Sequence, residues 1–462
     1  MSKKILFVEP SGVASNVFSY HSSLPLMGPV ILGTILAKEG HQVQIVNENM
    51  SKITRQDLDA DILAVSILTP TATRGYQVAR MYRAVNPKGR IIMGGIHASI
   101  LPEEALKHCD TVVTGEAEKI IADLVKYGSS EKIVAGSPLQ NLDDAPLPDF
   151  TLVRGHEKMD IIPIMTSRGC PFHCEYCSVT KMFGHQYRTM STERMAEAIK
   201  AAPGKYLFFY DDNINAQPKR TTEMMEKIIK DKLKIRWFAQ ARADIARDEN
   251  LLERMYEAGC TRLFIGFESI NPEALKQFNK RQEVEEIQKS IKTIHKKGIE
   301  IHGMFIFGSE TDSAPIFRKT QKFCRKMKID SAQFMILTPF PGTKVYDRIL
   351  AQGRLLHTKW KYYDGMHAVF APAKMKAVEL QRGMLDTYRR FYSRTALIKD
   401  VLQIFLRKAR SFVGSGFKVG RFPSFANLVV LHIGHMIVER WAKVNRGYIR
   451  YLGWWGKKTP AV

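Results

Sequence analysis

The sequence predicts an α/β protein in which a doubly wound, Rossmann-like sheet precedes a partial (β/α)6 barrel and a helical C-terminal region. Short apolar strand patterns alternate with helical segments in two series, and a Pro- and Asp-rich stretch without periodicity, residues 136–149, separates them. The chain has 462 residues, of which 45% are apolar, enough for several hydrophobic cores. The expected parts are a first domain over 1–135, a linker over 136–158, a barrel over 159–345, an accessory region over 346–395 and a basic helical tail over 396–462.

The first domain is expected to form a parallel sheet with ligand-binding loops at one edge. Its apolar strands are expected at residues 3–10, 43–46, 61–67, 90–93 and 111–113, with a helix over 27–38. Doubly wound sheets bind ligands at the carboxyl ends of their strands. Small and glycine residues there let a large flat ligand approach the backbone. The candidate contacts are Thr69, Gly94, Gly95, His97, Gly115 and Glu116.

Three cysteines follow the apolar run 161–165 in one short loop with the spacing CxxxCxxC: Cys170, Cys174 and Cys177. Thiolates this close in sequence can bind one iron–sulfur cluster, and three ligands leave one iron of a four-iron cluster open to another ligand. The alternative is a zinc site completed by His173 or His185. Zinc is usually bound by two pairs of ligands from separate parts of the chain, and neither His173 nor His185 belongs to such a second pair.

The cysteine loop, with Tyr176 before the third cysteine, resembles the signature of the radical S-adenosylmethionine (SAM) superfamily. The resemblance implies a [4Fe–4S] cluster whose open iron is chelated by the amino and carboxylate groups of SAM. It also implies an external one-electron reductant, such as flavodoxin or ferredoxin, and cleavage of SAM to a 5′-deoxyadenosyl radical that abstracts hydrogen from an unactivated carbon. The segments GFES, HGMFIFGSETD and LTPFPGT are similar to the family too, so the match covers roughly residues 160–345.

Six strands are expected in the barrel, at residues 161–165, 205–213, 235–244, 261–269, 299–310 and 331–343. Barrels of parallel strands carry their functional residues at the carboxyl ends of the strands. The candidates at these ends are Asp211, Asp212, Asn213, Arg242, Glu268, Ser269 and Gly308.

The resemblance implies that most of these side chains bind SAM. Asp211, Asp212 and Asn213 are expected at its amino or ribose groups, and Arg242 is a natural partner of its carboxylate. Helix capping is the structural alternative for the two aspartates, and a turn is the alternative for Gly308.

The first domain resembles the cobalamin-binding domain found fused to radical SAM domains, above all in GGIHASILPEEALKHCDTVVTGEAE, residues 94–118. Cobalamin domains of the methionine-synthase type carry DxHxxG, whose histidine ligates cobalt, and this chain has no such pattern. The resemblance is therefore to the branch that binds cobalamin without a protein histidine. His97 is expected to be a pocket or core residue, and a degenerate sheet that binds no cobalamin is the alternative.

Positive charge is concentrated near the C-terminus. Segment 371–462 has 18 Lys and Arg against 4 Asp and Glu, so it contributes +14 of the net charge of +23. Segments 396–413 and 425–438 have apolar residues at helical spacing, and 425–438 is too short to span a membrane. Trp441, Trp454 and Trp455 lie among cations beyond them. This pattern is typical of helices at a membrane surface, and the alternative is a helix packed on the barrel.

Cysteine usage and the N-terminus indicate the cytoplasm, with a peripheral position on the inner face of the membrane if the tail binds lipid. Six cysteines are too few for a disulfide framework, and the first residues begin a strand pattern rather than a signal peptide. Cys109, Cys260 and Cys324 are scattered singly and are expected as core thiols. In the accessory region, substrate-pocket and packing roles are both open for Tyr362, Tyr363 and His367.

The functional hypothesis is a cobalamin-type radical SAM enzyme that methylates an unactivated carbon of a hydrophobic, lipid-like or tetrapyrrole substrate. The resemblance extends to hopanoid C-methylases, lipid ring-forming enzymes and the anaerobic porphyrin-ester cyclase, so radical cyclisation or oxidation of a membrane lipid or pigment is the first alternative. RNA modification is the second, although methylthiolating members carry another three-cysteine cluster that this chain lacks. A non-enzymatic iron–sulfur scaffold or DNA-binding protein is disfavoured, because no groove-reading motif is present.

Overall fold

The computed structural model describes residues 2–12, 24–202, 204, 206–393 and 425–458. It comprises two compact units. The first contains Met1–Arg236, Pro339–Gly353 and Thr358–Asp364, and the second contains Trp237–Thr338, Arg354–His357 and Gly365–Val462.

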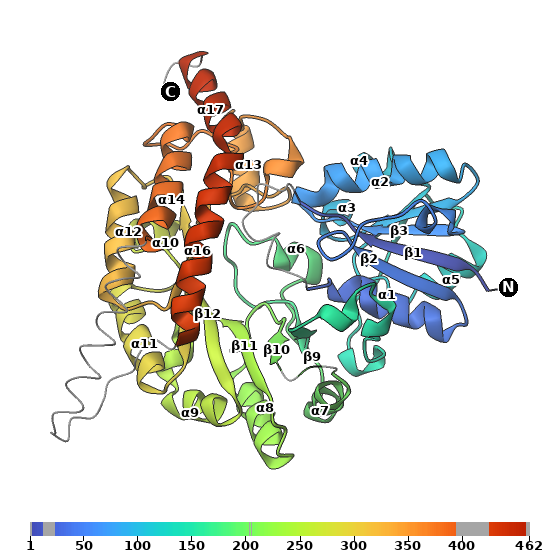
Figure 1. Ribbon diagram of the computed structural model, residues 1–462, viewed down its shortest axis with the longest axis horizontal. Coiled ribbons are helices and arrows are strands. Elements are labelled where there is room, and N and C mark those ends of the chain that lie inside the picture. Colours follow the sequence, from blue (N-terminus) through green and yellow to red (C-terminus); the bar gives the residue numbers. More distant parts are fainter. Residues whose placement is uncertain (1, 13–23, 203, 205, 394–424, 459–462) are drawn as a thin grey trace. The chain divides into compact units, whose positions relative to one another are not determined.

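A six-stranded parallel sheet with the order β2-β1-β3-β4-β5-β6 forms the N-terminal part of the first unit. Its strands are β1 (Lys4–Glu9), β2 (Gln42–Asn47), β3 (Ile62–Ser66), β4 (Arg90–Gly94), β5 (Thr111–Thr114) and β6 (Ile133–Ala135). Figure 1 shows helices on both faces, with α1 (Met27–Lys38) and α5 (Ile121–Tyr127) on one and α2 (Ala72–Val85) and α4 (Pro102–Leu106) on the other. The predicted doubly wound sheet is confirmed, and β6 is an additional strand too short to produce a sequence pattern.

The stretch predicted as a linker, residues 136–158, is packed against this sheet. Val153 forms a parallel bridge with Ile45 of β2, and the backbone N–H of Asp149 donates to Thr34 Oγ1 of α1 at 2.9 Å. Phe150 and Val153 are buried. The stretch contains the short turns η3 (Leu142–Asp144), η4 (Phe150–Leu152) and η5 (His156–Lys158). It therefore extends the edge of the first sheet as part of the first unit.

The second sheet also has six parallel strands, in the order β14-β13-β12-β11-β10-β7. They are β7 (Ile162–Ile164), β10 (Tyr206–Phe209), β11 (Arg236–Ala241), β12 (Cys260–Glu268), β13 (Glu300–Phe307) and β14 (Ser331–Ile336). Helices alternate with them: α7 (Thr192–Ala201), α8 (Pro218–Lys230), α9 (Glu249–Glu257), α10 (Pro272–Gln277), α11 (Val284–Lys296) and α12 (Pro315–Lys326). This succession confirms the predicted partial (β/α)6 barrel.

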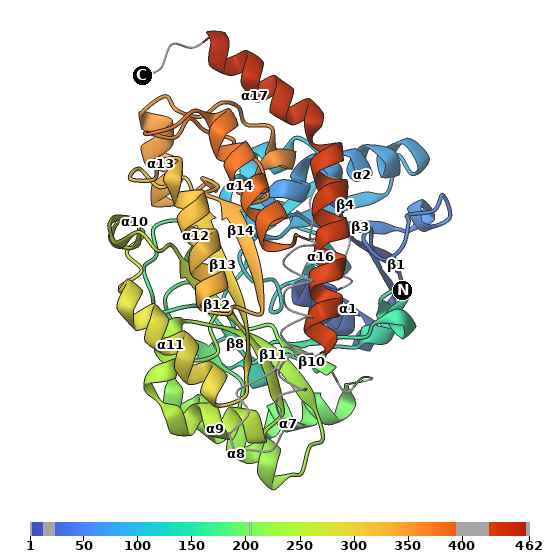
Figure 2. The same ribbon diagram turned by 60° about the vertical axis from the view of Figure 1, so that its left-hand side comes forward.

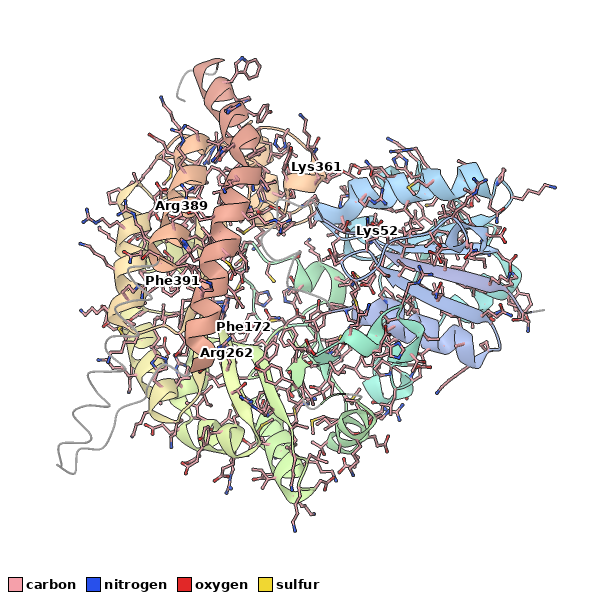
Figure 3. All side chains as sticks on the ribbon, viewed as in Figure 1. Lys52, Phe172, Arg262, Lys361, Arg389 and Phe391 are labelled. Carbon is pink, nitrogen blue, oxygen red and sulfur yellow. The ribbon has the colours of Figure 1, made fainter. Side chains whose placement is uncertain are left out.

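In the second unit, helices pack on one face of the strands, and together they form a hydrophobic core. Helices α11 and α12 contact β13 (Figure 2), and the ring of Phe334 on β14 packs against Tyr388 and Phe391 of α14 (Ala377–Phe391). Figure 3 labels Phe391 and its helix neighbour Arg389. The Arg389 guanidinium pairs with Glu439 of α16 (Phe425–Val444) at 3.1 Å. This core also holds the C-terminal helices.

Helices α16 and α17 (Arg446–Lys458) each bury one face against α14. Trp441 and Leu452 are only 4% and 1% exposed, and the Tyr448 hydroxyl donates to the carbonyl of Ala368 at 2.8 Å. The predicted amphipathic segment 396–413 lies outside the described residues. Among the residues that are described, no helix has both the length and the apolar character that crossing a membrane requires.

Candidate functional site

The three cysteines lie on the loop between the two-residue strand β8 (Ser167–Arg168) and α6 (Val179–Phe183), and all three are half-buried. The Cys177 N–H donates to the Cys174 carbonyl at 3.2 Å. Burial, together with the neighbouring Cys174, Asp212 and Cys170, raises the pKa of the Cys177 thiol to about 12. In the described part of the chain, no three His, Cys, Asp or Glu side chains gather tightly enough to hold one metal ion.

The chemistry of these donors fits an iron–sulfur cluster, because thiolates are its usual ligands. The two histidines considered as zinc ligands are exposed, and the rings of His173 and His185 lie against one another with centroids 4.1 Å apart. The three thiols are therefore the candidate cluster ligands.

Asp211 supports the start of the cysteine loop. The Asp211 carboxylate is fully buried and accepts three hydrogen bonds, from Thr166 N–H at 2.6 Å, Thr166 Oγ1 at 2.6 Å and Ser167 N–H at 2.8 Å. Burial raises the pKa of Asp211. Both oxygens are thus occupied by the chain that leads into the loop, three residues before Cys170.

Asp212 and Asn213 follow at the same strand end. Burial and the neighbouring Asp211 raise the pKa of Asp212 to about 7. Asn213 is only 3% exposed, and neither its amide nitrogen nor its amide oxygen has a hydrogen-bond partner in the described residues. A buried amide without partners costs on the order of 1–3 kcal/mol. Such a residue fits a polar ligand at the carboxyl end of β10.

Glu116 is the centre of a buried ionic network, so its carboxylate is not left open at the edge of the first sheet. Its carboxylate accepts from Arg168 Nη1 at 2.6 Å and pairs with Arg188, while Glu118 binds Arg168 Nη2 at 2.7 Å. All four side chains are at most 7% exposed. Arg168 and Arg188 are paired residues of β8 and β9 (Arg188–Thr189). The network therefore links the loop after β5 to the hairpin that frames the cysteine loop.

His97 and Thr69 are buried and bonded to protein groups. His97 Nδ1 lies 3.3 Å from Thr69 Oγ1, and Nε2 lies 3.4 Å from Glu104 Oε1. The same Glu104 oxygen accepts from the Tyr76 hydroxyl at 2.9 Å and from the indole of Trp360 at 2.8 Å. Burial lowers the pKa of His97, so the ring is neutral near pH 7. Its position in this cluster is that of a core histidine.

Gly95 and Gly115 have backbone conformations that favour glycine, with φ of 90° and 75°. A Cβ on Gly95 would lie 2.7 Å from the Ile67 carbonyl oxygen. The Gly115 N–H donates to Ser99 Oγ at 3.0 Å. Together with Gly94, these residues leave the carboxyl edge of β4 and β5 without bulky side chains, as a large flat ligand requires.

In the second unit, Glu268 and Arg242 both bind Lys280. Glu268 Oε1 accepts from Lys280 Nζ at 2.8 Å, and Arg242 Nη2 donates to the Lys280 carbonyl at 2.5 Å. Glu268 has a φ of 62°, which an L-residue rarely adopts. Strained backbone persists where the surroundings hold it in place and is frequent at functional sites. Ser269 Oγ accepts from the Asn271 N–H at 3.1 Å and so belongs to the following turn.

Gly308 is a turn residue after β13. Its φ is 105°, and its N–H donates to Asp312 Oδ2 at 3.0 Å. A Cβ there would lie 3.0 Å from a Leu380 methyl group. The backbone conformation and the packing both account for glycine at this position.

The sheet face opposite the core of the second unit is half-buried and carries both apolar and polar side chains. The rings of Phe264 and His302 lie 4.6 Å apart, and His302 Nδ1 is 2.8 Å from Ser331 Oγ. Burial lowers the pKa of His302 to about 3, so the ring is neutral. The other half-buried side chains of this face are Gln240, Met304, Gln333 and Met335.

Sequence reasoning missed the residues that complete these sites: Lys280, Arg168, Arg188, Glu118 and Arg348. Arg348 of α13 (Lys344–Ala351) binds Glu175, inside the cysteine motif, at 2.8 Å. One signal was available, since Arg168 is a charged residue between an apolar strand and the first cysteine. The remaining partners are distant in sequence or occupy unpatterned loops.

Comparisons with known proteins agree with this arrangement. The model of the radical SAM superfamily matches residues 164–316, and the model of the B12 binding domain matches residues 14–125. Bacteriochlorophyllide d C-12(1)-methyltransferase of Chlorobaculum tepidum is 30% identical, with 86% of this chain and 89% of that protein covered. Hopanoid C-3 methylase of Methylococcus capsulatus is 24% identical, with 90% and 86% covered.

A solved structure shares the fold. The cobalamin-dependent SAM radical enzyme OxsB, with aqua-cobalamin and SAM bound, has a TM-score of 0.66 and 14% identity, with 97% of this chain and 81% of that chain covered. Both sheets are thus accounted for by one architecture, and the similarity to the Chlorobaculum tepidum protein extends over most of both sequences. The chain therefore belongs to the cobalamin-binding radical SAM enzymes, whose cofactors are a [4Fe–4S] cluster, SAM and cobalamin.

Proposed function

We propose that this enzyme methylates an unactivated carbon of a hydrophobic lipid-like or tetrapyrrole substrate. The observation that carries the proposal is the 30% identity over 86% of the chain to a protein named as a bacteriochlorophyllide methyltransferase. When bound, the cofactors supply a 5′-deoxyadenosyl radical and a transferable methyl group. Hydrogen abstraction from carbon depends on position rather than on an acid or base, so the protein must bind, orient and exclude water.

We assign roles to the residues of the cysteine loop and of β10. Cys170, Cys174 and Cys177 ligate the cluster, and Asp212 and Asn213 bind polar groups of SAM. The unpartnered buried amide of Asn213 supports this assignment. Asp211 is a positioning residue, because its oxygens bind Thr166 and Ser167.

In the second unit, we keep Arg242 and Glu268 as candidate SAM contacts, with Lys280 orienting both. A hydrophobic substrate is supported by the half-buried face that carries Phe264, Met304 and Met335. Polar side chains stand on the same face, among them Gln240, His302 and Gln333, and they supply groups that orient a ligand.

Methylation is tested with methyl-deuterated SAM, a one-electron reductant such as reduced flavodoxin, the enzyme reconstituted with its cluster and cobalamin, and lipid and pigment extracts of the host. We expect deuterium in one product, with 5′-deoxyadenosine and S-adenosylhomocysteine formed in equal amounts. The Cys174→Ala variant, which lacks a cluster ligand, should give neither. Deoxyadenosine without S-adenosylhomocysteine would contradict methylation and favour cyclisation or oxidation; turnover only with RNA would contradict a hydrophobic substrate.

We further propose that the outer face of α16 and α17 binds an anionic membrane surface. Met436 and Val444 of α16 and Trp454 of α17 are 53%, 51% and 53% exposed. Exposed cations lie on the same helices: Arg440, Lys443, Arg446 and Arg450. The positive charge complements anionic lipid, and exposed apolar side chains between cations are typical of interfacial helices.

Vesicle binding tests this face. Lys443→Gln combined with Arg450→Gln should weaken binding to anionic vesicles by about thirtyfold, since each cation contributes on the order of 1 kcal/mol near such a surface. Added salt should weaken the wild type as well. Tyr127→Glu, on α5 of the first unit and 73% exposed, is the matched control and should bind like the wild type. Equal binding of the wild type and the double variant would contradict membrane binding by this face and would mean that α16 and α17 serve only in packing.

A further inference from the structure

Glu9 is the last residue of β1 and lies at the carboxyl edge of the first sheet. The connection that leaves β1 runs to β2 on one side, whereas the connection that leaves the neighbouring β3 runs to β4 on the other side, so the direction of the connections reverses between β1 and β3. In open α/β sheets this switch point is where ligands bind. Glu9 is 3% exposed. It also precedes residues 14–125, the segment that matches the B12-binding model.

Within the part of the chain that the structure describes, one of the two Glu9 carboxyl oxygens has hydrogen-bond partners and the other has none. Oε2 accepts from the Leu26 N–H at 3.0 Å and from Asn47 Nδ2 at 2.8 Å. Oε1 is buried and has no hydrogen-bond partner among the described residues. A buried polar atom without a hydrogen-bond partner costs free energy, and a ligand that supplies the missing partner would recover it.

Burial favours the neutral form of the Glu9 carboxyl group. Burial raises its pKa to about 8. Arg74, a cation held near this edge, is bound by Glu48 at 2.6 Å, and Glu48 also accepts from the Ser11 N–H. With Oε2 accepting two hydrogen bonds, the proton belongs on Oε1, which is then a hydrogen-bond donor. An acceptor is the partner that this neutral form fits.

We propose that Glu9 donates a hydrogen bond from Oε1 to an amide carbonyl on the rim of the corrin ring of cobalamin. Acetamide and propionamide side chains surround the corrin, so neutral carbonyl acceptors occur along its whole rim. A neutral acid meets such an acceptor without burying a charge. The contact belongs to the ring and not to the nucleotide tail of cobalamin.

Affinity measurements on the full chain with its cluster reconstituted test the contact. Hydroxocobalamin and cobinamide, which keeps the corrin rim but lacks the nucleotide tail, are titrated separately by absorbance. Glu9→Leu removes the donor and should weaken both ligands by about tenfold, the size expected for one hydrogen bond. Glu9→Gln should bind both within about twofold of the wild type, because its amide donates while its oxygen still accepts from Leu26 and Asn47.

Glu48→Gln is the matched control, a neighbouring carboxylate whose contacts are to protein groups, and it should bind both ligands like the wild type. Unchanged affinity of Glu9→Leu for both ligands would overturn the proposal. Loss in Glu9→Gln equal to that in Glu9→Leu would overturn it too. Weaker SAM binding with unchanged corrin binding would assign Glu9 to SAM instead.

A second measurement uses the folded wild type and does not depend on Glu9→Leu. Infrared difference spectra should show the band of a protonated carboxyl group that shifts to lower frequency when cobinamide binds, because its O–H gains an acceptor. The band should be missing in Glu9→Gln. No such shift in the wild type would refute the contact.

Discussion

Replacing Cys170, Cys174 or Cys177 with alanine is expected to abolish the [4Fe–4S] cluster and all cleavage of SAM. Each thiolate is a separate ligand of one cluster, so the loss of any one leaves two protein ligands. Anaerobically reconstituted wild type should contain about four irons per chain, and each variant close to none, as measured by iron content and charge-transfer absorption. This is the largest effect expected from any single substitution.

Cys260→Ala is the matched control, because Cys260 is buried in β12, where burial raises the pKa of its thiol. The variant should assemble the cluster normally, with at most a packing cost. Equal iron content in the triple-alanine variant and the wild type would rule out these ligands. Zinc recovered in place of iron after anaerobic expression would support the structural-metal alternative.

Glu116→Ala is expected to destabilise the first unit by about 3–5 kcal/mol, because it leaves two buried arginines with Glu118 alone. Arg188 donates to Glu116, to the Leu139 carbonyl and to the Phe183 carbonyl, so its position also orders the chain around the cysteine loop. We expect both a lower midpoint of chemical denaturation and reduced iron loading. Glu116→Gln should lose less, because its amide oxygen can still accept one hydrogen bond.

A double-mutant cycle distinguishes coupling within the ionic network from the independent effects of losing single side chains. Arg188→Met combined with Glu116→Ala should cost clearly less than the sum of the single variants, because the pair is removed together. Glu257→Ala is the control, since the Arg254–Glu257 pair is exposed and such pairs contribute about 0–1 kcal/mol. A cost below about 1 kcal/mol for Glu116→Ala, or strict additivity in the cycle, would contradict a coupled network.

The assignment of Glu116 shows the limit of local sequence reasoning. From the sequence it is a polar residue after an apolar strand, at an edge where ligands bind. Its partner Arg188 is 72 residues further along the chain. Only the packing of the β8–β9 hairpin against the loop after β5 brings the two charges together. In the structure, Glu116, predicted from the sequence as a cobalamin contact, therefore forms ion pairs with Arg168 and Arg188.

The sequence by itself determined the succession of the main strands along the chain and placed three cysteines on one loop as candidate cluster ligands. These features are local: apolar runs record the burial of single strands, and CxxxCxxC places three thiols on one loop whatever the rest of the chain does. The bounds of α1 agree with the helix predicted over 27–38 for the same reason.

Tertiary structure alone decided which polar side chains are hydrogen-bonded to protein groups and which have no such partner among the described residues. Asp211, Asp212 and Asn213 are adjacent letters, yet Asp211 is saturated by Thr166 and Ser167 while the buried amide of Asn213 has no partner in the described chain. Likewise, only packing on α14 shows which face of α16 and α17 stays exposed. Hydrogen-bond satisfaction and burial depend on partners that are distant in sequence, and local patterns carry no record of those partners.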